Sequence, residues 1–390
     1  MKKLWRDLRF WLALGLLLRV AFVVALGSRQ YQTDELSHEH AAWTLADKGV
    51  LGHEGVAKVL PPLPDSLYAL VYAVTGRDFL YARLAQAALS ALIVLVLYRM
   101  GKDLLGSEET GLWAARIGAV YPFFVYYSGM LMTESLYTLL AALGYWQLCV
   151  SLKERGKNWK RAAWAGAALA AAALTRTEGA IIALVILAVI AGWAALGRYS
   201  WKAWAVGTAV FLLPLFAWTA RNRAVSGYWT LDNHGGITFY TGTAYFELGE
   251  IDTQYVMEAF YRSSFWAKHK DLDDTAFDRV CFDAAVQFMR ENPARTFGQW
   301  IQKTINFWRL WPRTDKLYSD SEYSKPAVGL KRWVLVAASA AFEPWLLALG
   351  LWGMYRRRAD LNFLFPLPLL ILGTFAAHLL TVSMMRYRVP

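Results

Sequence analysis

Three acidic side chains lie beside long apolar runs. A charged side chain in such a place costs free energy and usually has a function. Asp34 and Glu35 follow the first apolar run, and Glu134 lies in a short turn between two later runs. A positioned carboxylate can act as a general base toward a hydroxyl. We therefore interpret Asp34, Glu35 and Glu134 as candidate catalytic residues. Helix capping by Asp34, or by Thr133 ahead of Glu134, stays open as the alternative.

Basic residues near the expected outer ends of apolar runs form a second candidate group, for binding a phosphate. They are Arg176, Lys58, Arg221, Arg386 and Arg388. Basic residues normally gather on the cytoplasmic side of a membrane protein, so these run against the usual bias. An arginine offers a phosphate two parallel hydrogen bonds. Snorkelling of these side chains to lipid headgroups is the alternative.

A third group is rich in histidine and acidic residues and could bind a metal. The weak candidates are His38, His53 and Glu54. His38 and His40 are two positions apart, so on a helix they point in different directions and cannot share one ion. A divalent metal is therefore kept only as an open cofactor, and no other cofactor is indicated.

Carboxylates and arginines on one face of a membrane suit transfer of a sugar from a lipid-linked phosphate. The leaving group is already a phosphate, so it needs positive charge and no acid. The acceptor hydroxyl needs one general base. Hydrolysis of a glycoside would instead need two flanking carboxylates.

The elements that position these residues are predicted to be membrane-spanning helices. The 390 residues are 57% hydrophobic and include 19 Trp, a residue that favours the membrane interface. Runs of about 20 apolar residues can each span a bilayer. We predict an all-α polytopic bundle of about nine spans near residues 10–27, 79–98, 111–129, 132–151, 162–176, 179–197, 203–220, 333–354 and 361–383.

Charge alternation orients this bundle. The basic residues at the N-terminus and in every second loop predict a cytoplasmic N-terminus in an inner (plasma) membrane, although the segment Pro64 to Thr75 must then lie in the outer interface. The net charge of +11 is thus explained by loops facing the cytoplasm, and we exclude nucleic acid as a partner.

Three regions follow from this topology. Residues 1–220 form a seven-span catalytic module that includes an outer loop at 28–78. Residues 221–332 form an extracytoplasmic or interfacial segment with two amphipathic stretches, Ala276 to Arg290 and Thr296 to Trp308. Residues 333–390 form a two-span module, and we expect the natural chain to continue past Pro390.

An ordered set of short motifs resembles a known family. The set comprises Asp34-Glu35, Lys58 with Pro61-Pro62, Thr133-Glu134, Leu174-Thr175-Arg176-Thr177-Glu178-Gly179, Arg221-Asn222 with Gly235-Gly236, Asn292-Pro293 and Arg386-Tyr387-Arg388-Val389-Pro390. On the predicted topology it resembles the bacterial glycosyltransferases of the C superfamily (GT-C). The nearest type is the dolichyl-phosphate-mannose protein mannosyltransferase-like family, which also includes the lipid A aminoarabinose transferases.

This resemblance implies roles for particular residues. It implies that Asp34 is the catalytic base, Glu134 the second-loop acid and Arg176 the phosphate-binding residue. It also implies an inverting hexosyl- or pentosyltransferase with a polyprenyl-phosphate-linked sugar donor, and a protein, lipid or glycan acceptor. Two departures are that Lys58 does not directly precede the Pro-Pro pair and that Thr177 replaces the family's proline.

Two other functions remain open at this point. A transporter or flippase of a lipid-linked substrate would place ionisable groups and broken helices at the bilayer midplane. A ligase that uses a lipid-diphosphate glycan donor would rely on arginines and need less from Asp34.

The topology makes a prediction about accessibility. With Cys149 and Cys281 replaced by Ala, a cysteine at Lys270 should react with a membrane-impermeant maleimide from outside. A cysteine at Arg357 should react only from the cytoplasm, which makes it the matched control. Labelling of intact cells decides the question, and a position 270 that reacts only after permeabilisation contradicts the topology.

Overall fold

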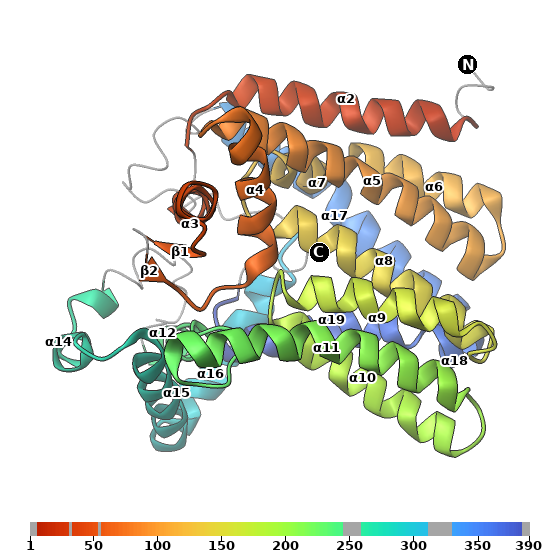
Figure 1. The fold of residues 1–390 in the computed structure, drawn as a ribbon. Coiled ribbons are helices and arrows are strands. Elements are labelled where there is room, and N and C mark those ends of the chain that lie inside the picture. Colours follow the sequence, from red (N-terminus) through yellow and green to blue (C-terminus); the bar gives the residue numbers. More distant parts are fainter. Residues whose placement is uncertain (1–5, 31–32, 54–55, 245–258, 311–329, 384–390) are drawn as a thin grey trace. The chain divides into compact units, whose positions relative to one another are not determined.

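The computed structural model describes residues 6–30, 33–53, 56–244, 259–310 and 330–383 (Figure 1). Helices dominate these residues, and the two strands among them pair as a short antiparallel ladder between β1 (Gly52–His53) and β2 (Val56–Ala57). The prediction of an all-α fold is therefore confirmed apart from this ladder.

The chain divides into two compact units, which are described separately. The first comprises residues 1–221, 349–370 and 389–390, and the second comprises 222–348 and 371–388. The three-part division at 220 and 332 was made on predicted membrane topology, and it stays a prediction.

The first unit contains the helices that precede residue 221, together with the short elements near residue 360. They are α2 (Leu8–Leu26), α3 (Thr33–Lys48), α4 (Pro62–Thr75), α5 (Phe79–Leu105), α6 (Glu108–Val120), α7 (Pro122–Ser128), α8 (Glu134–Lys153), α9 (Trp159–Ala173), α10 (Glu178–Ala195), most of α11 (Trp201–Ser226), η1 (Arg358–Asp360) and α18 (Leu361–Leu364).

Local sequence explains where the long helices begin and end. Asp78 caps α5 by accepting a hydrogen bond from the backbone N–H of Leu80 at 2.8 Å, and Gly106 ends the helix in the left-handed conformation. Ser107 then caps α6, so two residues reverse the chain. The two helices pack along each other as a result.

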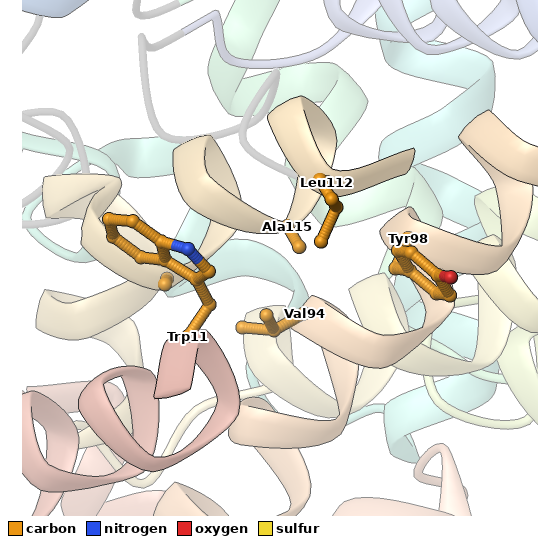
Figure 2. Close-up of a cluster of buried hydrophobic side chains, with 6 residues drawn as sticks. Trp11, Val94, Tyr98, Leu112 and Ala115 are labelled. Atoms are coloured by element: carbon orange, nitrogen blue, oxygen red, sulfur yellow. The ribbon is translucent and has the colours of Figure 1, made fainter. Parts of the chain in front are cut away.

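Apolar side chains join α2, α5 and α6. Trp11 of α2, Val94 and Tyr98 of α5, and Leu112 and Ala115 of α6 belong to one buried cluster (Figure 2). Burial of large apolar side chains stabilises such a contact. This cluster fixes the C-terminal half of α5 against α2 and α6, and the polar residues Arg83 and Gln86 of the candidate site lie nearer its N-terminal end.

A fully buried arginine, Arg19, donates hydrogen bonds to backbone carbonyls at the break between α6 and α7. Pro122 has no backbone N–H, so the helix stops at Val120 and leaves carbonyl groups without helical partners. Arg19 of α2 donates to two of them, at Gly118 (3.1 Å) and Ala119 (3.2 Å), and to the hydroxyl of Ser90 (3.0 Å). The sequence analysis did not single out Arg19.

The nine predicted spans all coincide with helical segments, but their number is not settled. Among the described residues, six helices are long and apolar enough to cross a membrane, or seven if a pair bent by 77° at residue 365 counts as one span. The helices α6, α7 and α9 have 13, 7 and 15 residues, against about 20 for a typical span. The chain is thus a multi-pass membrane protein, and nine spans stay a prediction.

The second unit is built around α12 (Gly235–Ala244), α14 (Ser264–His269), α15 (Asp274–Glu291) and α16 (Pro293–Phe307). The helices α17 (Leu330–Arg356) and α19 (Pro366–Leu380) each extend across the division between the units. Both amphipathic stretches predicted in this region are helical, as α15 and α16.

Candidate active site

Asp34 and Glu35 occupy the first turn of α3, and they point to different surroundings. Asp34 is exposed, whereas Glu35 is fully buried. Successive side chains on a helix diverge by about 100°, which explains the difference. Because α3 begins at Thr33, Asp34 lies inside the first turn rather than at an N-cap ahead of Glu35.

Glu35 forms a buried ion pair that joins three parts of the chain. Its Oε1 accepts from Nη2 of Arg83 at 2.8 Å and from the backbone N–H of Leu131 at 3.0 Å. Arg83 also donates to the carbonyl of Gly27 at 2.7 Å, and both charged side chains are fully buried. Glu35 therefore links α3 to α5, to the end of α2 and to the turn ahead of α8.

Two further polar side chains hold that turn. The amide of Gln86 donates to the carbonyls of Tyr127 (2.8 Å), Ser128 (3.3 Å) and Met130. The hydroxyl of Tyr68 contacts the side-chain oxygen of Gln86 and lies 2.9 Å from the Met132 carbonyl. These bonds fix the residues just before α8 and so position its first residue, Glu134.

Glu134 is buried and faces Arg176. Its Oε1 lies 3.7 Å from Nη1 of Arg176, whose Nε is 3.0 Å from a carboxylate oxygen of Glu178. The guanidinium also lies 5.7 Å from the ring centre of Tyr137. Thr133 occupies the N-cap position of α8 without a side-chain capping bond, and Glu134 lies in the first turn. Arg176 thus bridges the first turns of α8 and α10.

The other predicted phosphate-binding residues have different surroundings. Arg221 donates to the backbone carbonyls of Lys58 (2.7 Å) and Leu51 (3.4 Å), and its guanidinium lies 4.8 Å from the ring centre of Trp218. It therefore holds the segment around β1 and β2, and Lys58 follows β2 with a half-buried side chain. Arg386 and Arg388 lie outside the described residues.

His38 pairs with a carboxylate rather than with other metal-binding groups. Its Nδ1 lies 2.6 Å from Oδ1 of Asp65, which is buried in the first turn of α4. Glu54 and the side chain of His53 lie outside the described part of the chain. Within that part no three His, Cys, Asp or Glu side chains gather as a metal site.

The carboxylates around His38 set its proton affinity. Burial lowers the pKa of His38, but Asp65, with added contributions from Asp34 and Glu134, raises it above the ordinary value overall. His38 lies four residues after Asp34 on α3, and its ion pair is with Asp65 on α4.

Sequence reasoning missed the side chains that support this site. Arg83 and Gln86 lie within a predicted span, and Asp65 and Tyr68 lie in the segment assigned to the interface. Charged and amide side chains inside apolar segments are the signal that could have found them, because such groups are rarely buried without a partner.

The predicted family resemblance is confirmed for the central part of the chain. Residues 59–219 match the family described as dolichyl-phosphate-mannose-protein mannosyltransferase. The matched segment contains Glu134 and Arg176, whereas Asp34 precedes it. A comparison with curated proteins found no match.

Two solved structures show a distant likeness. One is ArnT from Cupriavidus metallidurans bound to undecaprenyl phosphate, with 14% identity, a TM-score of 0.46, and coverage of 95% of this chain and 76% of that chain. The other is the archaeal oligosaccharyltransferase AglB from Archaeoglobus fulgidus, in complex with an inhibitory peptide and a dolichol-phosphate. It has 14% identity, a TM-score of 0.47, and coverage of 98% of this chain and 48% of that chain.

The two adjacent acids should respond differently to loss of charge. Glu35→Gln leaves Arg83 buried without its counter-charge, which typically costs about 3–5 kcal/mol. Asp34→Asn keeps the shape of an exposed side chain and should change stability little. Thermal unfolding in detergent measures both variants, and a Glu35→Gln protein as stable as Asp34→Asn would contradict the supporting role of Glu35.

Proposed function

We propose that this protein is a glycosyltransferase that moves a sugar from a polyprenyl-phosphate-linked donor to an acceptor hydroxyl on the extracytoplasmic face of the inner membrane. The observation that carries the proposal is a pair of charged groups in one unit, the buried Glu134 with Arg176 3.7 Å away, together with the exposed Asp34 in the first turn of α3. The mannosyltransferase family match over residues 59–219 supports the same reaction class.

Asp34 is proposed as the general base. It is the exposed member of the acidic pair, so it can reach a substrate, whereas the Oε1 atom of Glu35 is engaged by Arg83 and Leu131. The acceptor oxygen attacks the anomeric carbon as Asp34 takes its proton, and the bond to the phosphate oxygen breaks. A single displacement of this kind inverts the anomeric configuration.

Arg176 is proposed to bind the donor phosphate. Negative charge grows on the phosphate as it leaves, and a fixed guanidinium stabilises that charge. Tyr137, Glu134 and Glu178 hold Arg176 in place before the donor arrives. Glu134 would then orient the guanidinium, and Lys58, Arg221, Arg386 and Arg388 remain proposed assistants.

Transport remains the second candidate. A transporter would place ionisable groups and interrupted helices within the bilayer, and Arg19 with the break at Pro122 has that form. The guanidinium of Arg19, however, donates to Gly15, Gly118, Ala119 and Ser90. The bonds to Gly118 and Ala119 satisfy carbonyls of the broken helix, which supports a structural role for Arg19 and favours the transferase.

Replacing the base should abolish turnover without loss of donor binding. A positioned base contributes about 10²–10⁴-fold, so Asp34→Asn should reduce turnover several hundred-fold. Mass spectrometry of products from polyprenyl-phosphate sugars and candidate acceptors measures this. Asp47→Asn, an exposed aspartate on the same helix, is the control, and near-normal turnover of Asp34→Asn would remove the catalytic assignment.

Removing the phosphate ligand should weaken donor binding. A charge-assisted bidentate pair contributes about 1.5–3 kcal/mol, so Arg176→Ala should bind the donor roughly ten-fold to a hundred-fold less tightly. Arg176→Lys should rescue only part of this, because lysine lacks the planar fork. Arg161→Ala, which removes a half-exposed ion pair with Glu154, is the control. Unchanged affinity of a folded Arg176→Ala protein would overturn the assignment.

A further inference from the structure

The His38–Asp65 pair is built like a proton acceptor with a fixed orientation. An ionised carboxylate can only accept hydrogen bonds, so Asp65 selects the form of His38 that carries its proton on Nδ1. In the neutral ring the other nitrogen, Nε2, then holds the lone pair that can take a proton. The Asp65 side chain is buried, at 3% exposure, whereas that of His38 is 24% exposed, so the ring remains accessible.

His38 stands close to the proposed base. It lies four residues after Asp34 on α3, and residues at this spacing are neighbours on one helix face. Asp65 of α4 bonds to the imidazole, and Asp34 on α3 and Glu134 at the start of α8 add to the rise in its pKa. The charged groups around His38 are therefore carboxylates on α3, α4 and α8.

We propose that His38, oriented by Asp65, is a positioning residue that relays the acceptor proton away from Asp34 and returns Asp34 to its ionised form. The inference rests on the proposed glycosyl transfer and adds a second proton carrier to it. Neither the family match nor the sequence motifs assign this role to the pair.

The proton leaves the acceptor and reaches His38 in two steps. First, the acceptor O–H bond breaks as its oxygen bonds to the anomeric carbon, its proton passes to the Asp34 carboxylate, and the anomeric carbon–oxygen bond electrons leave on the lipid phosphate. Second, the proton moves from Asp34 to Nε2 of His38, which gives an imidazolium paired with Asp65. The imidazolium then loses its proton to water through the exposed part of its ring.

An ordinary imidazole binds a proton more tightly than an ordinary aspartate carboxyl group does. The ordinary pKa of His is about 6.5, against about 3.9 for Asp, and the surrounding carboxylates raise the pKa of His38 further. The same shift means that His38 is neutral, and able to accept, only at pH values above its raised pKa.

The test is the pH profile of kcat for the full-length protein in detergent with a polyprenyl-phosphate sugar. Wild type should show a kcat that rises with pH as His38 becomes neutral. In His38→Asn the amide N–H can still bond to Asp65, but the side chain cannot titrate. This variant should lose the rise and about ten-fold of the plateau kcat, with donor affinity unchanged.

Matched variants separate the relay from a structural role. His40→Asn changes an exposed histidine on the same helix and should keep the wild-type profile. Asp65→Asn should resemble His38→Asn, because an amide can donate to Nδ1 and move the ring proton to Nε2. The double variant should lose no more than either single one, since both act on one step. Thermal unfolding and donor binding test whether each variant folds. If His38→Asn does not fold, His38→Gln is used in its place.

The outcomes distinguish the relay from the reaction itself. An active His38→Asn protein that keeps the pH-dependent rise, or a wild-type kcat that falls as His38 becomes neutral, overturns the relay and leaves the transferase assignment standing. A wild-type protein that transfers sugar from no polyprenyl-phosphate donor overturns both.

Discussion

Backbone groups freed where a helix breaks must be satisfied inside an apolar bundle, and this constraint shapes the first unit. Water is scarce there, and each unpaired buried carbonyl or amide costs free energy. The chain breaks after Val120 and again between α7 and α8, beside the proposed site. Arg19 satisfies the first break, whereas Gln86 and Glu35 satisfy the second. The broken segment therefore has defined geometry.

The same constraint gives the neighbouring residues Glu35 and Asp34 different surroundings. Glu35 supplies an acceptor to Leu131 and a counter-charge to Arg83, so its carboxylate is committed to the fold. Asp34, one residue earlier on the helix, is exposed, and this exposure is why it is the member of the pair proposed as the base. This arrangement places the proposed base next to a rigid support.

The sequence predicted the helices and the charged groups better than it predicted their partners. Long apolar runs located helices at all nine expected places, and residues 59–219 match the expected family. Helical periodicity explains why Asp34 and Glu35 diverge. The partners of Arg19 and Gln86 could not be predicted, because they are backbone carbonyls far along the chain, which carry no sequence signal. The stretch rich in histidine and acidic residues makes His38 a metal-ligand candidate, and its actual partner Asp65 could not be predicted because it lies on another helix.

At the proposed phosphate site, the carboxylates that hold Arg176 in place would also repel a bound phosphate. Its Nε faces Glu178 and its Nη1 lies at the longer distance of 3.7 Å from Glu134, beyond a hydrogen bond. A donor phosphate approaching this guanidinium would be attracted to it but repelled by both carboxylates, since like charges at short range destabilise each other. The proposed site would therefore bind a phosphate through a guanidinium that Glu134 and Glu178 orient, with the net attraction reduced by the charge of both carboxylates.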